Sequence, residues 1–272
     1  MAYLFPEITY THGNQIKLDS FPKTLNKDIM EIFGYWVGDG WYSGYSWGLV
    51  FFGGDTDVLE HFDILCTQYL RYPYIRDLRL KKNSNAFEML INNISLVRYC
   101  RETLQLNKHQ LPAWIMAASD AHKAAFLRGF FEADGCIFYS ETHRSPSTLS
   151  AVGKSPILMQ GIRTLLGDLG VESRSYILYV AGVPYTSIYI PSYYRRSFQN
   201  KIGFISDRKQ KLLDIVCTRG DMNQSIKWIN PTSLANGENW YHNVKGNTGQ
   251  YKDEEAKEFE DEFSEFVEPE VE

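Results

Sequence analysis

The sequence lacks the features that mark several classes of protein. It has no run of eighteen apolar residues and no charged start leading into an apolar stretch, so we expect neither a membrane-spanning helix nor a secretory leader. The four cysteines stand far apart without a Cys-x-x-Cys pair, which argues against a disulfide framework or a thiolate metal site and predicts an intracellular protein with reduced thiols. The six histidines lack metal-ligand spacing, and no phosphate-binding glycine loop or G-x-S-x-G nucleophile motif occurs.

Acidic residues exceed basic ones over the whole chain, but the excess is confined to one end. The 272 residues include 33 acidic and 28 basic side chains, a net charge of −5. Residues 251–272 hold 11 acidic and 2 basic residues, a charge of −9, which leaves residues 1–250 at +4. A mildly basic body with an acidic tail remains compatible with a nucleic-acid partner, although the average charge argues against one.

An internal repeat organises most of the chain. Residues 32–40 match residues 127–135 at an offset of 95, and both segments end in Asp-Gly after an apolar stretch with helical spacing. Residues 49–53 then align with residues 149–153 at an offset of 100, and amphipathic helical patterns follow both. Each copy is predicted to run helix, two strands, helix, two strands, helix. The fold class is therefore α/β, of the α+β kind, with two pseudo-symmetric αββαββα half-domains.

The repeat and the shifts in composition set the expected domain boundaries. In chain order, we expect a lead-in, a first half-domain, a linker, a second half-domain, a C-terminal extension and an acidic tail: residues 1–24, 25–110, 111–118, 119–217, 218–250 and 251–272. Phe259, Phe263 and Phe266 would lie on one face of a helix in the tail if a partner received that face. A solvated tail without fixed structure is the alternative.

Small residues recur on one face of the two helices that head the repeats. Gly34 and Gly129 lie in helix interiors, where a glycine costs roughly 0.5–1 kcal/mol relative to alanine. Four residues later come Gly38 and Ala133, so each helix has a ridge that allows a second backbone to approach closely. We therefore expect these two helices to pack against each other.

Asp39 and Asp134 end the same two helices, each followed by a glycine that we expect to adopt a left-handed cap conformation. A carboxylate at a helix C-terminus opposes the helix dipole, and two such carboxylates side by side repel each other. A divalent cation reverses both effects, and an all-oxygen site of this kind suits Mg²⁺ or Mn²⁺. A single Asp-Gly commonly does no more than end a helix, but the duplicated pair predicts metal-assisted phosphodiester hydrolysis.

With these motifs the sequence resembles the two-motif LAGLIDADG homing endonucleases over about residues 25–216. The residues that match the two motifs are Gly34, Gly38, Asp39 and Gly40 in the first and Leu127, Gly129, Ala133, Asp134 and Gly135 in the second. Residues 111–115 and 202–209 also look like that family. The resemblance implies two half-domains with saddle-shaped antiparallel sheets, packed through motif helices whose aspartates bind the catalytic metal ions.

The resemblance also implies roles for individual residues. Asp39 and Asp134 would be catalytic metal ligands, with carbonyl oxygens of Gly38 and Ala133 as further donors, and Lys154 would position water. The helix interface would consist of Gly34, Gly38, Gly129 and Ala133. Candidates for DNA contact lie along the predicted strands, where an ordinary solvated role is the alternative for each: Tyr42, Tyr45, Arg76, Arg79, Lys81, Lys82, Tyr139, His143, Arg144, Arg174 and Tyr176.

These observations predict a monomeric enzyme that binds double-stranded DNA and makes a metal-dependent double-strand break in a long, asymmetric site. The start of the chain and the absence of a terminal His-Asn pair indicate a free-standing or intron-encoded protein rather than a self-splicing intein. One alternative is a nucleic-acid-binding relative without nuclease activity, an intron RNA maturase or a DNA-binding regulator. It is favoured by Asn92-Asn93 and Pro191-Ser192, which stand where the family often has a strand-end lysine. The other alternative is an interaction protein that acts through its acidic tail.

Overall fold

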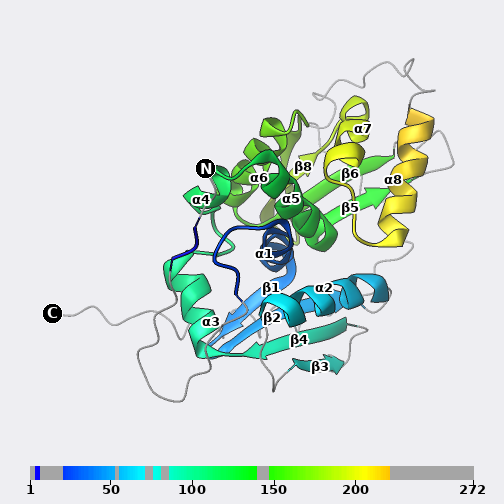
Figure 1. The fold of residues 1–272 in the computed structure, drawn as a ribbon. Helices are drawn as coiled ribbons and strands as arrows, with labels where there is room; N and C mark the ends of the chain where they lie inside the picture. Colours follow the sequence, from blue (N-terminus) through cyan, green and yellow to red (C-terminus); the bar gives the residue numbers. More distant parts are fainter. Residues whose placement is uncertain are drawn as a thin grey trace. The chain divides into compact units, whose positions relative to one another are not determined.

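Two four-stranded antiparallel sheets, one from each repeat, lie on either side of a central pair of helices (Figure 1). The computed structural model describes residues 4–6, 21–52, 55–70, 76–80, 86–139 and 147–220. They belong to one structural unit, Met1–Gln224, and the second unit, Ser225–Glu272, lies wholly outside them. The predicted acidic tail and most of the predicted C-terminal extension therefore lie outside the described residues.

The secondary-structure elements follow the repeat. The first half consists of α1 (Lys27–Asp39), β1 (Gly40–Ser43), β2 (Ser46–Phe52), α2 (Thr56–Tyr69), β3 (Arg76–Leu80), β4 (Ala86–Asn92), α3 (Ile94–Arg98) and the π-helical turn η1 (Tyr99–Thr103). A short helix, α4 (Ala113–Met116), lies in the predicted linker. The second half consists of α5 (Asp120–Asp134), β5 (Gly135–Phe138), β6 (Thr148–Gly153), α6 (Pro156–Asp168), β7 (Arg174–Val180), β8 (Val183–Tyr189), α7 (Ser192–Lys201) and α8 (Asp207–Gly220).

The two sheets have the same topology. The strand order is β1-β2-β4-β3 in the first sheet and β5-β6-β8-β7 in the second, and every neighbouring pair is antiparallel. The predicted α+β fold, with two pseudo-symmetric halves packed through the helices that head them, is thereby confirmed. The second half departs from the prediction because it ends in two helices, and α8 continues to Gly220, beyond the expected boundary at residue 217.

Local sequence signals explain where helices begin. Asn26 precedes α1, and its side-chain oxygen accepts a hydrogen bond from Ile29 N at 2.9 Å. Ser155 does the same for Leu158 N at the start of α6, where Pro156 occupies the first turn. Both residues satisfy amide groups that a helix N-terminus leaves without an internal partner.

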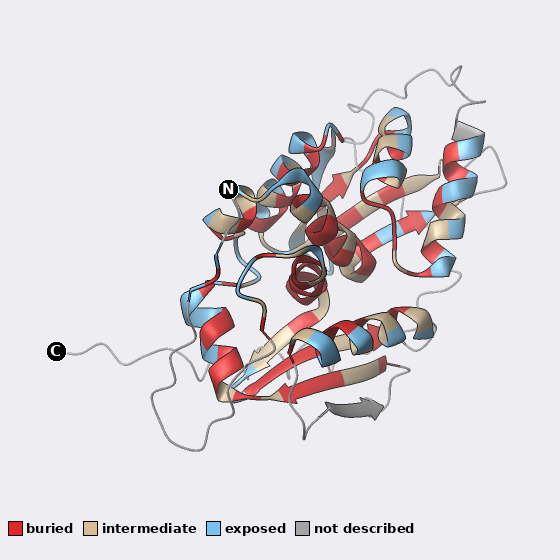
Figure 2. Ribbon diagram, in the orientation of Figure 1, coloured by how far each residue is buried: buried red, intermediate tan, exposed pale blue. Residues whose placement is uncertain are grey.

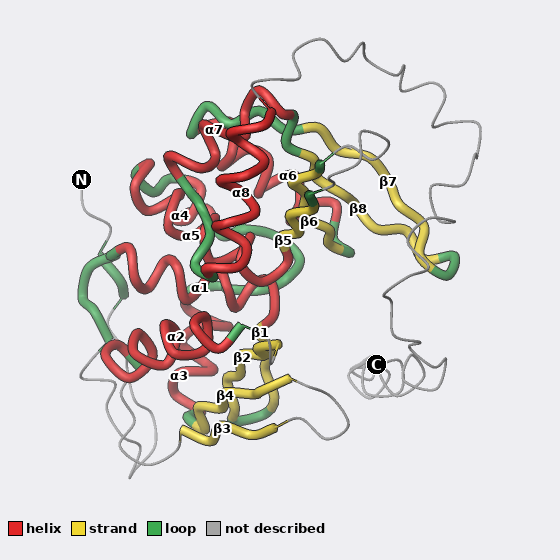
Figure 3. The backbone as a smooth tube through the Cα atoms, turned by 90° about the vertical axis from the view of Figure 1, so that its right-hand side faces the viewer, coloured by secondary structure: helices red, strands yellow, loops and turns green. Residues whose placement is uncertain are grey.

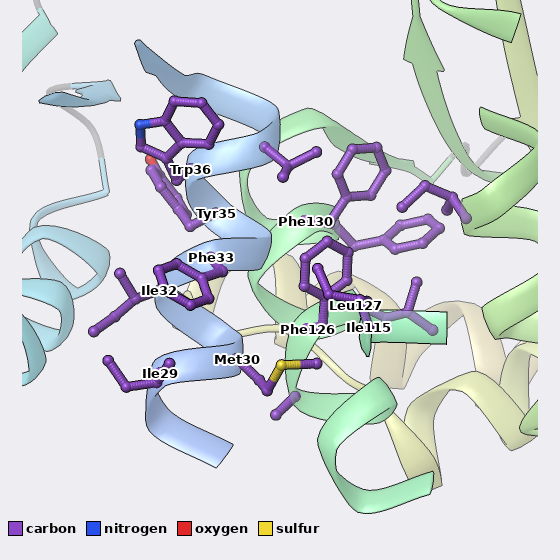
Figure 4. Packing of buried hydrophobic residues seen from close by; sticks show 14 of the residues in the cluster. Ile29, Met30, Ile32, Phe33, Tyr35, Trp36, Ile115, Phe126, Leu127 and Phe130 are labelled. Carbon is purple, nitrogen blue, oxygen red and sulfur yellow. The ribbon is translucent and has the colours of Figure 1, made fainter. Parts of the chain in front are cut away.

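The small residues of α1 and α5 bring the two helix backbones into contact. A Cβ atom added at Gly34 would lie 1.9 Å from Phe126 O, and one at Gly129 would lie 2.1 Å from Glu31 O. Figure 4 shows that large side chains of α1, such as Ile29 and Ile32, point into the first half, and that Phe130 of α5 points into the second. The helices thus approach closely because glycine leaves room between them, as the small-residue ridges predict.

The core lies between the central helices and the inner face of each sheet (Figure 2). In the first sheet, alternate residues of β2, namely Trp47, Leu49 and Phe51, are almost completely buried. The second sheet extends past the core, because β7 is exposed along most of its length and projects with β8 as a long hairpin (Figure 3). Among the described residues, no helix combines the length and apolar character needed to cross a membrane.

The glycines that follow the two aspartates do not adopt the expected left-handed cap. Gly40 has φ −90° and ψ 168°, and Gly135 has φ −79° and ψ 139°, so each is extended and begins a strand directly. Glycine is required at both positions because a side chain there would collide with the preceding turn of the helix. A Cβ atom at Gly40 would lie 2.5 Å from Trp36 O, and one at Gly135 would lie 2.2 Å from Phe131 O.

Candidate active site

The packing of α1 against α5 brings the two aspartates that end these helices to one place. Asp39 and Asp134 are each partly exposed, on the last turn of their helix. The carboxyl carbon of Asp134 lies 3.4 Å from the Cβ position built at Gly38, the residue before Asp39. The two carboxyl groups therefore lie beside the seam between the helices.

Both carboxyl groups hold protons more tightly than an aspartate in water. Burial raises the pKa of Asp39 above its usual value. Burial, and secondly the charge of Asp39, raise the pKa of Asp134 to about 7. Lys108 and Lys209 act in the opposite direction on both groups. Concentrated negative charge of this kind is what a divalent cation would relieve.

Lys108 is one of two lysines that act on the carboxyl groups of Asp39 and Asp134. It lies in the segment after η1, and its Nζ donates a hydrogen bond to Gly38 O at 2.5 Å. Loss of solvation lowers the pKa of Lys108, while Asp134 and Asp39 raise it. The ammonium therefore lies at the C-terminal end of α1, where the helix dipole favours a cation.

Lys209 occupies the matching place in the second half. It is buried in the first turn of α8, and its Nζ donates hydrogen bonds to Glu132 O and, at 3.4 Å, to Phe131 O. It lies at the end of α5 as Lys108 lies at the end of α1. Motif and strand spacing in the sequence indicate neither lysine as a site residue, although Lys108 lies beside, and Lys209 within, a segment that resembles the family, residues 111–115 and 202–209.

A pocket of about 140 Å³ opens beside Asp39. Tyr35 is fixed in its wall by stacking on Phe51 at 5.0 Å between ring centroids and by donating from its hydroxyl to Val50 O at 2.9 Å. The pocket contains carboxylates from both halves and two cations from α8 of the second half. Its lining consists of Tyr35, Asp39, Phe51, Asp55, Val58, Glu132, Ala133, Arg208 and Lys209.

The donor set fits a hard divalent cation. Gly38 O, expected as a metal ligand, accepts a hydrogen bond from Lys108, which leaves its second lone pair for a metal ion. Ala133 does line the pocket. Among the described residues, no group of three or more His, Cys, Asp or Glu side chains could hold a metal. Two carboxylates nevertheless suffice for Mg²⁺, which keeps several waters and takes substrate phosphate oxygens as further ligands.

Lys154 neither lines the pocket nor is among the cations that act on the two aspartates, which argues against its predicted role. Its Nζ stands over the ring of Tyr185, 5.9 Å from the centroid, and the side chain is exposed. The cations that act on Asp134 are Lys108 and Lys209. Loop residue Lys154 follows β6 on the solvent side, and sequence spacing does not show which way such a residue turns.

Two of the tyrosines predicted to contact DNA turn toward the core instead. Tyr42 pairs in register with the buried Trp47, so both side chains lie on the same, inner face of the sheet. Its hydroxyl donates to Leu106 O at 3.2 Å. Tyr139 also packs against the core. We therefore remove Tyr42 and Tyr139 from the set of proposed DNA contacts.

The other candidates differ in how far the structure describes them. Tyr45 is 62% exposed in the turn between β1 and β2, and Tyr176 is 50% exposed on β7. Arg174, at the start of β7, is exposed as well. Arg76 and Arg79 lie on β3, where register pairs them with Ile91 and Glu88 of β4. The remaining four candidates lie outside the described residues: Lys81, Lys82, His143 and Arg144.

Comparison with known proteins identifies the second half. Residues 121–203 match the family model of the LAGLIDADG-like domain. Residues 121–203 therefore resemble a LAGLIDADG-like domain. The matched segment includes Asp134 and all four strands of the second sheet, and the first half repeats its strand order. The predicted resemblance to the LAGLIDADG family is thereby confirmed.

Solved structures of LAGLIDADG proteins are similar to the chain at low sequence identity. The homing endonuclease I-DmoI, in complex with DNA and Mn, is 16% identical with a TM-score of 0.48, covering 65% of this chain and 96% of that one. Full-length DUF199/WhiA from Thermatoga maritima is 17% identical with a TM-score of 0.49, covering 77% of this chain and 64% of that one. At this level the likeness assigns neither an activity nor a ligand to this chain.

One curated relative matches about half of the chain. The glutamine–fructose-6-phosphate aminotransferase (isomerizing) of Methanocaldococcus jannaschii is 27% identical over 143 residues, which are 49% of this chain and 12% of that protein. Because the chain matches only this small share of its length, the similarity does not extend to aminotransferase chemistry.

Proposed function

We propose that this LAGLIDADG protein is a DNA endonuclease that uses a divalent metal ion to make a double-strand break in a long, asymmetric site and acts as a monomer inside the cell. The observation that carries the proposal is the convergence of Asp39 and Asp134 at adjacent helix ends, with Lys108 and Lys209 beside them. Carboxylates and ammonium groups gathered in this way suit the binding of a metal ion and a phosphodiester together.

Asp39 and Asp134 would hold Mg²⁺ or Mn²⁺ between the helix ends. When bound, the ion supplies Lewis-acid stabilisation of the phosphoryl oxygens and an activated water. The raised pKa of each carboxyl group supports this assignment, because both groups gain from a nearby positive charge.

Lys108 and Lys209 take the electrostatic part of the mechanism. Each ammonium is anchored by backbone carbonyls at the end of its helix, so its position is set before DNA arrives. A preorganised cation stabilises the charge that develops on the phosphoryl oxygens in the transition state. We propose that each lysine acts on one DNA strand. The two lysines would then take the place of those that the family often has at the ends of its β-strands.

DNA would lie across the open faces of the two sheets. Tyr45, Arg174 and Tyr176 are the described candidates that face solvent there. Arg76, Arg79, Lys81, Lys82, His143 and Arg144 remain proposed contacts on the basis of sequence. Alternate residues of a strand point to the same face, so one sheet can present several of them to a groove.

The proposal is tested by selecting cleaved sequences from a randomised duplex library in Mg²⁺ and then assaying variants on the selected site. Asp39→Asn and Asp134→Asn should each abolish cleavage while DNA binding, measured by gel shift, is largely retained. If both variants nick the site at the rate of the parent protein, the metal assignment is wrong.

A DNA- or RNA-binding protein without nuclease activity is the second candidate. It is favoured by the hydrogen bond from Lys108 to Gly38 O, which places an ammonium group on the predicted metal ligand. Salt-dependent binding of duplex DNA or structured RNA, with no cleavage in either Mg²⁺ or Mn²⁺, would establish this candidate instead.

A further inference from the structure

The N-terminal turn of α8 joins the two halves of the molecule at the pocket beside Asp39. Asp207 N donates to Asp57 Oδ2 of α2 at 2.7 Å. The next residue, Arg208, binds Asp55, and the third, Lys209, binds the backbone of α5. The first two residues of this turn are thus held by the first half, and the third is held by the second half.

Arg208 is bound to Asp55 through only part of its guanidinium group. Its Nε donates to Asp55 Oδ1 at 2.8 Å and its Nη2 to Asp55 Oδ2 at 2.7 Å. A guanidinium has five N–H groups, so three remain for a further acceptor. The side chain is 57% exposed and lines the pocket together with Asp39 and Lys209. An exposed pair of this kind contributes little to stability, and its main effect is on the direction of the guanidinium.

The other charged residues of the pocket leave Arg208 as the group that is open to a ligand. Glu132 already accepts hydrogen bonds from Ile205 N, Ser206 N and Ser206 Oγ. Lys209 is buried against carbonyl oxygens of α5. Arginine is suited to phosphate because its planar donors match two phosphate oxygens at once.

We propose that Arg208 binds the scissile phosphate in the pocket beside Asp39 and that Asp55 is the positioning residue that directs it there. This inference rests on the proposed nuclease function, and it makes the two halves unequal. The residue that matches Asp55 in the second half is Ser155, whose hydroxyl donates to His109 O at 2.5 Å. A hydroxyl cannot hold both arms of a guanidinium, so the arrangement serves one of the two DNA strands.

The test measures the cleavage of each strand separately, on a duplex of the selected site labelled at one strand or the other. The variants are Arg208→Gln, Arg208→Lys and Asp55→Asn. The control is Lys211→Gln, which removes a charge from the solvent-facing side of the same helix, where Lys211 is 76% exposed.

We expect Arg208→Gln to slow cleavage of one strand by about 10²-fold and Asp55→Asn by about tenfold, with the other strand unaffected. Arg208→Lys should retain intermediate activity because it keeps the charge but loses the planar donors. Lys211→Gln should leave both rates unchanged. DNA affinity of all four variants should stay close to that of the parent protein.

Three outcomes would overturn the inference. Parent-like rates for both strands in Arg208→Gln would exclude phosphate binding by this residue. Equal slowing of both strands, together with a lowered melting temperature, would indicate a structural link between the halves instead. A parent protein that binds the site and cleaves neither strand in Mg²⁺ or Mn²⁺ would overturn the proposed nuclease function, and this inference with it.

Discussion

At the scale of single residues, the site is governed by two carboxyl groups that the fold withdraws partly from water. Asp134 has a pKa of about 7 and Asp39 a raised pKa, because burial disfavours the charged form of both. Neither carboxylate stabilises the metal-free fold. Raised pKa values of this kind are what the proposed role of the two groups as metal ligands leads us to expect.

The pH dependence of stability follows from the direction of these shifts. A carboxyl group with a folded-state pKa above its unfolded value binds more protons when folded, so metal-free stability should fall as pH rises from about 4 to about 7. Asp134→Asn should remove this penalty and stabilise the metal-free protein by roughly 2–4 kcal/mol at pH 8, and by much less at pH 5.

Chemical denaturation in a chelator at the two pH values measures the effect. Asp207→Asn is the control, because Asp207 is 85% exposed and should show no comparable gain. Equal stability of Asp134→Asn and the parent protein at pH 8 would show that the charged carboxylate of Asp134 does not destabilise the fold.

Lys108 and Lys154 carry the same charge, but only Lys108 lies beside the two aspartates. Lys108→Gln should lower cleavage by about 10²-fold with DNA affinity retained, because its ammonium lies at the end of α1 beside the aspartates. Lys154→Gln should leave the chemical step unchanged, because Lys154 stands over Tyr185. Single-turnover cleavage measures both, and the reverse order of effects would restore Lys154 to the site.

At the scale of elements, the contact between α1 and α5 fixes the position of the site. Gly34→Ala should destabilise the protein by about 3 kcal/mol or more, because the added methyl group meets a backbone oxygen that cannot move aside. Gly167→Ala in α6 is the matched control, since nothing lies within 4 Å of the added methyl group. It should be neutral or stabilising by up to about 1 kcal/mol.

Thermal and denaturant unfolding of the two variants measures these changes. Similar stabilities for Gly34→Ala and Gly167→Ala would contradict a close contact between the helix backbones.

Glu132 connects α5 to the start of α8 and thereby places Lys209. Its carboxylate accepts from Ile205 N at 2.7 Å, Ser206 N at 3.0 Å and Ser206 Oγ at 2.8 Å. Glu132→Ala should cost about 2–4 kcal/mol of unfolding free energy, because three donors, two of them on the buried Ser206, lose their acceptor. Hydrogen exchange at the amides of residues 205 and 206 should accelerate at the same time. Unchanged protection there would contradict this role.

At the scale of the whole molecule, the distribution of charge predicts how the protein treats non-target DNA. Residues 251–272 have a charge of −9 against +4 for the remainder. Deleting them should raise the affinity for random duplex DNA, because an acidic segment on the same chain competes with phosphates for the basic surface.

Titration of a random duplex at several salt concentrations measures this effect, with a tail of equal length carrying Gln and Asn in place of Glu and Asp as control. Unchanged off-site binding after truncation would rule out shielding by the tail. A body without any salt-dependent DNA affinity would support a protein that acts through its tail.

The sequence by itself determined the architecture and the position of the two aspartates. A repeat whose copies carry the same small-residue ridge predicts a helix pair, because only small residues permit two backbones to meet. Asp39 and Asp134 follow from it, since each comes one residue after the last small residue of its ridge. Features that depend on local spacing alone could therefore be predicted from the sequence.

Only the tertiary structure decided which cations lie beside Asp39 and Asp134 and which strand residues face solvent. Lys108 meets Gly38 across 70 residues of chain, and Arg208 meets Asp55 across 153, separations at which no sequence period operates. Tyr42 turns inward because strand register places it beside Trp47, and a shift of one residue would have reversed its face. Contacts between distant segments are fixed by packing, and packing is a property of the folded chain as a whole.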